Sequence, residues 1–157
     1  MRPQNENEHI KVFLGGTCAG SDWRDRIIPL LGIDYVNPVT SNRTMENRAE
    51  EIRQRETCGL LLYTITGEMR GYYSIAEAVE DAHLSPQKMV VCWLLERFDI
   101  HQVKSLEEVA DLIRRHGVPV VYSLEAAANE VNSLAARMQA THQMIREKLG
   151  LTPSPAH

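Results

Sequence analysis

The chain has 157 residues, a formal net charge of -4 and 43% hydrophobic residues, values typical of one globular domain with its own core. Its Lys and Arg residues are scattered, so no basic face for nucleic acid is expected, and no apolar run approaches the ~20 residues of a membrane span. The start of the chain, residues 1–9, is polar and lacks the apolar segment of a signal peptide. We therefore expect a disordered tail there and a cytoplasmic protein.

In chain order, short apolar runs alternate with segments of helical periodicity. The apolar runs predict five strands, at residues 9–16, 33–39, 58–66, 88–95 and 118–123. The segments between and after them predict five helices, at residues 23–32, 44–56, 74–83, 105–117 and 124–149. A capping box formed by Ser105 and Glu108 marks the expected start of the fourth helix.

This order of elements predicts an α/β fold. Strands that are apolar throughout and alternate with helices favour a parallel sheet covered on both faces. We expect a three-layer, doubly wound sandwich with strand order 2-1-3-4-5, which is a flavodoxin-like or Rossmann-like arrangement. It would form a single domain over residues 10–150, followed by a second disordered tail at 151–157. Such folds bind ligands beyond the carboxyl ends of the strands, near the point where the strand order reverses.

The last predicted helix is long for a small domain. At ~1.5 Å per residue it would extend ~39 Å, beyond the expected width of the sheet. Its apolar stripe continues from Leu124 through Met138 to Leu149. The outer part, from Met138 on, would be exposed to water unless a second subunit covered it. We therefore expect a homo-oligomer, a dimer or larger, that uses this helix.

The cysteines and histidines show no pattern typical of a metal site. The three cysteines, Cys18, Cys58 and Cys92, form no CxxC pair, and the six histidines fall at no metal-ligand spacing. We expect reduced thiols, no metal and no cofactor. Cys58 and Cys92 lie in apolar runs and should be buried in strands.

The loop after the first strand, GGTCAGSDW (15–23), is a candidate binding loop. Gly15 and Gly16 would let a ligand approach the backbone closely, and Ser21 or Asp22 could cap the next helix. A simple strand-to-helix turn explains the same residues. The loop has neither the GxGxxG pattern of dinucleotide sites nor the GK[ST] ending of a P-loop. No partner base is identifiable that would make Cys18 a nucleophile.

The segment RGYYSIAEAVEDA (70–82) places a carboxylate, Glu77, in the expected first turn of the third helix. Ser74 and Glu77 have the spacing of a capping box, which gives both a purely structural role. The same position supports a functional reading, because the positive end of the helix dipole would hold the carboxylate ionised. A positioned, ionised carboxylate can attack an anomeric carbon. Gly71 would give backbone access, and Tyr72 and Tyr73 offer flat surfaces for a base or sugar.

Several segments together resemble one known group of enzymes. They are VFLGGTCAGSDWRDRIIPLL (12–31), YVNPV (35–39), RETCGLLLYTITGEMRGYYSIAEAVEDA (55–82) and FDIHQVKSLEEVADLI (98–113). The chain resembles the nucleoside 2-deoxyribosyltransferase-like group, within the superfamily of N-deoxyribosyltransferases and nucleotide N-glycoside hydrolases. The resemblance implies a Rossmann-like fold that cleaves the N-glycosidic bond of a deoxynucleoside or nucleotide.

The resemblance also implies a set of site residues. Glu77 fills the place of the nucleophile, and Ser74 matches a position that contacts sugar or phosphate. Gly15, Gly16 and Thr17 match the loop under the nucleoside. The remaining candidates for substrate binding lie at the ends of the strands and helices nearby: Asp22, Asn37, Gly71 and Tyr73.

Two positions depart from the pattern of that group. Gly59 stands where related sequences often have Asp, and TSNR (40–43) replaces an Asp-Trp pair. The acid that would protonate the leaving base is not identified, since Glu68 also fits an ordinary surface loop. Transfer to another base, hydrolysis and loss of activity all remain open. The alternatives are a module that binds a nucleotide without cleaving it, and a structural subunit that assembles through its last helix.

Overall fold

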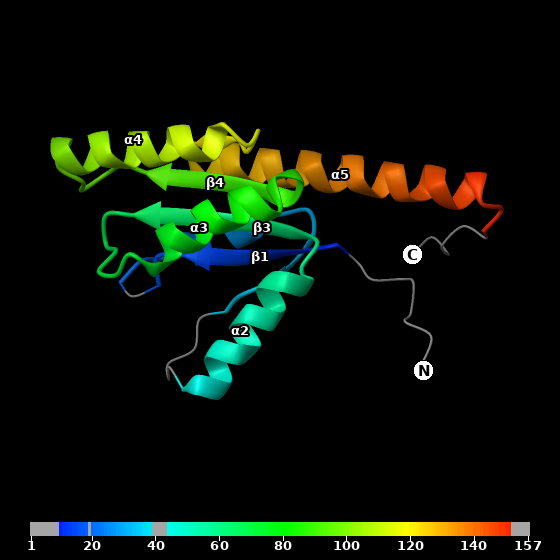
Figure 1. Ribbon diagram of the computed structural model, residues 1–157, viewed down its shortest axis with the longest axis horizontal. Coiled ribbons are helices and arrows are strands. Elements are labelled where there is room, and N and C mark those ends of the chain that lie inside the picture. The colour runs from blue at the N-terminus through cyan, green and yellow to red at the C-terminus, as the bar shows by residue number, and fades with distance from the viewer. Residues whose placement is uncertain (1–9, 19, 39–43, 152–157) are drawn as a thin grey trace.

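The computed structural model describes residues 10–18, 20–38 and 44–151 and shows a five-stranded parallel sheet (Figure 1). The strand order is β2-β1-β3-β4-β5, as the sequence predicts. Residues 1–9 and 152–157, which hold the two predicted tails except Leu151, lie outside the described residues. The strands are β1 Lys11–Gly16, β2 Asp34–Val36, β3 Leu60–Thr66, β4 Met89–Leu94 and β5 Val120–Val121.

In the part of the chain that the structure describes, five α-helices and two short 3-10 helices connect and follow the strands. They are α1 Trp23–Ile27, η1 Ile28–Leu30, α2 Met45–Thr57, α3 Tyr73–Leu84, η2 Pro86–Lys88, α4 Ile100–Arg114 and α5 Leu124–Lys148. The first predicted helix is shorter than expected because Pro29 lacks an amide hydrogen and the chain tightens into η1. None of the helices in the described ranges is long and apolar enough to cross a membrane.

The start of α4 differs from the prediction. The helix begins at Ile100, and Ser105 and Glu108 lie inside it. Asp99 is the cap: its carboxylate accepts a hydrogen bond from the Gln102 amide at 2.8 Å, and the Gln102 side chain accepts one from the Asp99 amide at 2.9 Å. This is also a capping box, and it begins six residues before the predicted one at Ser105.

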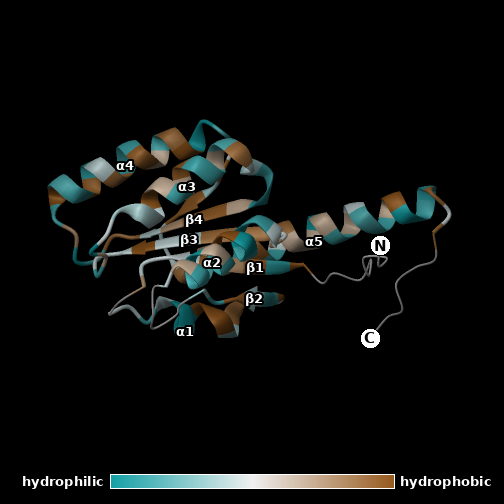
Figure 2. Cartoon of the chain, turned by 60° about the horizontal axis from the view of Figure 1, so that its bottom comes forward, coloured by the Kyte–Doolittle hydropathy of each residue, from teal (hydrophilic) through white to brown (hydrophobic). Residues whose placement is uncertain are grey.

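Two apolar cores lie on opposite faces of the sheet, which gives the three expected layers. Alternate residues of β1, β3 and β4 face α3 and α4 on one side, around Tyr63 and Trp93. The other residues face α1 and α5, around Trp23 and Val131. Figure 2 shows mostly hydrophobic strands β3 and β4 between helices that carry both hydrophobic and hydrophilic residues. Cys92 is buried in β4 as predicted, whereas the buried Cys58 follows α2 and precedes β3.

Helix α2 is the least integrated helix of the fold. It points away from the sheet in Figure 1, and of its 13 residues only Arg55 is buried. Its first residue, Met45, is 90% exposed. Thr44 caps the helix by accepting a hydrogen bond from the Asn47 amide at 3.1 Å. The contacts of Arg55 therefore do much to set where α2 lies against the rest of the molecule.

Candidate functional site

The carboxyl end of β1 is joined to β3 by backbone and side-chain bonds of Thr17. The Thr17 amide donates to the Thr64 carbonyl at 3.0 Å, and the Thr17 hydroxyl accepts from the Thr66 amide at 2.9 Å. Gly16 has φ of +123°, and a Cβ there would lie 1.9 Å from the Thr64 carbonyl oxygen. A Cβ on Gly15 would lie 2.6 Å from the ring of Tyr63. Both glycines are thus required by the approach of β3, independently of any ligand.

Two adjacent side chains of α1, Trp23 and Arg24, donate hydrogen bonds to the backbone of β1 and of the loop that follows it. The Trp23 indole nitrogen and the Arg24 Nη1 both donate to the Thr17 carbonyl, at 2.8 and 2.6 Å. Arg24 also donates to the Leu14 carbonyl from Nε at 3.1 Å and from Nη2 at 2.9 Å. Burial lowers the pKa of Arg24, and the nearby Cys18 opposes that change. These two residues fix the shape of the loop and were not expected to do so.

Ser74 connects the start of α3 to the end of β1. Its hydroxyl donates to the Gly16 carbonyl at 3.2 Å. The helix begins at Tyr73 with Tyr72 in the capping position and no side-chain cap, so the predicted capping box of Ser74 and Glu77 is wrong. Ser74 is bonded across to another element, and Glu77 is thereby left without the helix amide that a capping box would supply.

Glu77 binds an arginine from α2. Its carboxylate accepts a hydrogen bond from Arg55 Nη1 at 2.6 Å, and Glu77 is only 6% exposed. The same guanidinium contacts two further carboxylates of α3, Glu80 through Nη2 at 2.8 Å and Asp81 through Nε at 3.2 Å. The spacing of 77, 80 and 81 places the three acids on one face of the helix, where a single arginine reaches all of them.

A tyrosine of β3 completes this group. The Tyr63 hydroxyl donates to the Asp81 carboxylate at 2.6 Å, deep in the core between the sheet and α3. We name the group the Arg55 cluster: Arg55, Tyr63, Glu77, Glu80 and Asp81. Sequence reasoning identified Glu77 and missed the other four members. Arg55 is one of several arginines in a charged helix, and the only signal was its place near the end of α2, just before a buried strand.

The charges of the Arg55 cluster shift the pKa values of its members. Burial raises the pKa of Glu77, and the hydrogen bond from Arg55 opposes the rise. Burial likewise raises the pKa of Asp81, against the bonds from Tyr63 and Arg55. Burial lowers the pKa of Arg55, but the bond to Glu77 and the charges around it outweigh burial and raise it overall. Arg55, more than the helix dipole, is what stabilises a negative charge on Glu77.

The other predicted binding residues lie closer to solvent. Tyr73 is 46% exposed, with the Arg48 guanidinium 5.2 Å from its ring centre, and Gly71 is also exposed. Asn37 follows β2 and is exposed. Asp22 occupies the position before α1, but its side chain makes no cap hydrogen bond and lies 3.8 Å from Arg26 instead.

Glu68 does not resemble a proton donor. Its carboxylate accepts a hydrogen bond from Arg97 at 2.9 Å. Hydrogen bonding to Thr66 lowers the pKa of Glu68, which favours the ionised form. The residue is therefore better described as part of a loop ion pair than as the acid for a leaving base.

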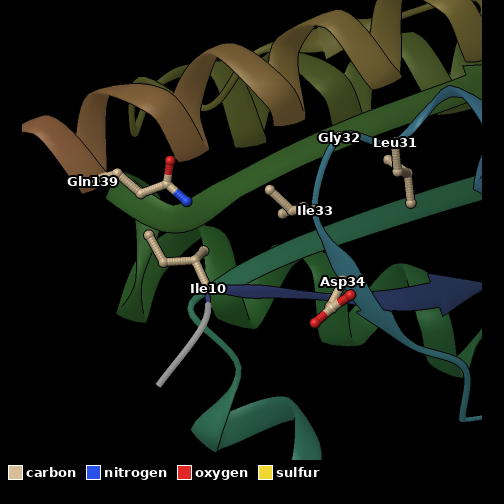
Figure 3. Close-up of a pocket in the computed structure, with 6 residues that line it drawn as sticks. All are labelled: Ile10, Leu31, Gly32, Ile33, Asp34 and Gln139. Carbon is tan, nitrogen blue, oxygen red and sulfur yellow. The ribbon is translucent and has the colours of Figure 1, made fainter. Parts of the chain in front are cut away.

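Among the described residues, the predicted site residues line no part of a hollow at the amino end of the sheet and belong to no metal-ligand cluster. This hollow has a volume of about 510 Å³ (Figure 3). Within the described ranges, no group of three His, Cys, Asp or Glu residues could hold a metal ion. Burial raises the pKa of the thiols of Cys58 and Cys92, which keeps both protonated.

Comparison with known proteins assigns no family or function to this site. No family model matches this chain, and no curated protein does either. The structure brings Gly16, Thr17 and Ser74 together at the carboxyl ends of β1 and β3, and it places Glu77 one turn further along α3 in the Arg55 cluster.

Proposed function

We propose that the protein cleaves the N-glycosidic bond of a nucleoside or nucleotide, with Glu77 as the nucleophile. One observation carries the proposal: the buried ion pair between Glu77 and Arg55, one helical turn from the contact of Ser74 with Gly16. A buried carboxylate with a perturbed pKa and a specific charge partner is more frequent at functional sites than elsewhere. Arg55 would stabilise the ionised form, which is the form that attacks carbon.

The proposed reaction has two steps. A carboxylate oxygen of Glu77 forms a bond to C1′ of the sugar while the bond from C1′ to the base nitrogen breaks. The base leaves with that electron pair and takes a proton from water. A second base, or water, then attacks C1′, the ester bond breaks, and the Glu77 carboxylate is restored. Transfer and hydrolysis differ only in this second nucleophile.

Access to Glu77 requires a local movement. The side chain is almost fully covered, and part of the cover is Arg55 on α2. Because α2 buries no other residue, its displacement would uncover Glu77 without opening an apolar core. Elements with few buried contacts are those that open most readily. In this proposal, a substrate binds between α2 and α3 and takes up part of the space that α2 occupies.

The test is incubation with a panel of ribo- and deoxyribonucleosides and their 5′-phosphates, with and without an acceptor base, followed by chromatography of the bases. Glu77→Gln should abolish release and exchange of base. The matched control is Glu80→Gln, which removes a carboxylate of the same cluster that is 58% exposed, and it should retain most of the activity. Retention of full turnover by folded Glu77→Gln would contradict the proposed nucleophile.

A second candidate is a module that holds a nucleotide without cleaving it. The observation that favours it is the closed state of Glu77, whose carboxylate is occupied by Arg55. This candidate predicts a rise in melting temperature with a nucleotide and no free base after long incubation. Detection of the free base in the same samples would exclude it, so one experiment separates the two functions.

A further inference from the structure

The core between the sheet and α5 is open at the amino end of the sheet. Ala128 and Val131 of α5 are buried against β3 and β4, whereas Met138, two turns later, is only partly covered. Figure 1 shows α5 continuing well past the sheet. Where the core reaches the surface, the hollow of about 510 Å³ lies between α5 and the segment that enters β2 (Figure 3). Its lining is Ile10, Leu31, Gly32, Ile33, Asp34 and Gln139.

The apolar stripe of α5 continues past this opening. Steps of four and three residues connect the whole stripe, which is the repeat of a helix that packs against another helix. Its members are Leu124, Ala128, Val131, Ala135, Met138, His142, Ile145 and Leu149, of which His142 is polar. The first four are buried in the protein's own core. The last three project from the free end of α5, where Ile145 is 48% and Leu149 is 68% exposed.

We name residues 139–149 the overhang. Ten of them lie within α5 and extend about 15 Å at 1.5 Å per residue. Met144 and the following Leu151 are also half exposed, so four exposed apolar side chains lie on or next to the overhang. An exposed apolar strip that is continuous with an open core is typical of an interface rather than of a solvent-facing helix.

The residues outside the described range differ in composition from the overhang. Residues 1–9, MRPQNENEH, and residues 152–157, TPSPAH, are mostly polar and contain no apolar run. A second copy of the chain, in contrast, carries an apolar overhang beside a hollow of its own. A twofold axis lets each overhang fill the other's hollow, so that the two contacts are identical and the assembly closes at two copies.

Charge supports the same partner. The overhang carries two cations, Arg146 and Lys148, against one carboxylate, Glu147. The hollow displays the carboxylate of Asp34. A cationic helix end that approaches an acidic wall favours association, and two overhangs that met only each other would repel.

We propose that the chain forms a twofold dimer in which the overhang of each copy lies in the hollow of the other. Sedimentation of the full chain should then give twice the mass of 17.8 kDa, falling to one copy on dilution. Ile145→Asp places a charge in the centre of the contact and should raise the dissociation constant by about thirtyfold or more. Because Ile145 is half exposed in one copy, the variant should still fold, and near-UV circular dichroism checks this.

The matched control is Ala140→Asp, which adds the same charge to the same overhang on its opposite face and should leave the dissociation constant unchanged. A second variant tests the hollow itself: Asp34→Lys should weaken the dimer, because it would face the cationic overhang. A monomeric or larger wild-type protein, or equal effects of Ile145→Asp and Ala140→Asp, would overturn the dimer. Dissociation by Ile145→Asp together with an unaffected Asp34→Lys would overturn the placement of the overhang in the hollow.

Discussion

The two ends of the sheet are built in opposite ways. At the carboxyl end, and along α3 that starts there, polar groups satisfy one another: Thr17 binds β3, Ser74 binds Gly16, and Arg55 and Tyr63 occupy the carboxylates of α3. At the amino end, apolar side chains are exposed along the overhang, and the hollow beside it is lined by apolar and polar residues together. Under the proposed function the closed polar end has to open before a substrate can reach Glu77, whereas exposed apolar side chains are stabilised in water when a partner covers them.

The largest expected loss of stability comes from removing the Arg55 guanidinium. Arg55→Met leaves Glu77 and Asp81 buried without their shared partner, which should cost about 3–5 kcal/mol of the free energy of unfolding at pH 7. Urea denaturation measures this difference. The control is Arg53→Met on the same helix, where the side chain is 70% exposed and its ion pair with Glu50 contributes about 1 kcal/mol or less.

An equal loss of stability in these two variants would show that the Arg55 cluster is not what holds α2 in place. The same pair of variants sharpens the proposed function. If α2 must move to uncover Glu77, Arg55→Met should also make the α2 amides exchange faster with solvent than Arg53→Met does.

The next prediction compares the loss of stability when a leucine is shortened at the buried start of α5 and at its exposed end. Leu124 is 3% exposed and packs in the core, so Leu124→Ala should cost about 2–5 kcal/mol at any protein concentration. Leu149 is exposed in the single copy, so Leu149→Ala should cost little in dilute solution. Its cost should grow at concentrations where the dimer forms, because stabilisation by a partner depends on mass action. Melting curves at two concentrations check both statements, and a Leu149→Ala cost independent of concentration would contradict the dimer.

The architecture could be predicted from the sequence because strands that are apolar throughout, such as residues 60–66, are typical of a parallel sheet covered on both faces. The boundaries of α4 could not, because Ser105 with Glu108 and Asp99 with Gln102 both spell a capping box and only tertiary packing selects one. The predicted capping box of Ser74 was wrong for a related reason. The Ser74 hydroxyl donates a hydrogen bond to the Gly16 carbonyl, which lies 58 residues away in the chain.

The candidate site was predictable only in part. Glu77 stands out in the sequence because a helix start that follows a buried strand is a recurrent site position. The partner that defines its chemistry, Arg55, comes from an otherwise exposed and charged helix, where no periodicity separates it from Arg48 or Arg53. Buried ion pairs join elements that are distant in the sequence, and local patterns carry no information about which arginine turns inward.

The smallest expected effect concerns pH and decides whether burial or Arg55 dominates at Glu77. The pKa values of Glu77 and Asp81 are raised by burial, so the folded chain binds more protons than the unfolded chain just above the ordinary carboxyl range. Stability contributed by this pair is therefore complete below the ordinary carboxyl pKa and falls as pH rises through the raised values. Urea denaturation between about pH 4 and pH 7 should show this decline.

Glu77→Gln should flatten that decline, because an amide does not titrate, whereas Glu80→Gln should retain it, because the Glu80 side chain is largely exposed to water. The effect is small because the bond from Arg55 offsets much of the burial. Stability that rises across the interval, and loses its rise in Glu77→Gln, would mean that Arg55 outweighs burial. The closed end would then hold Glu77 ionised at every pH where the protein is folded, and α2 would have to break a full ion pair to open.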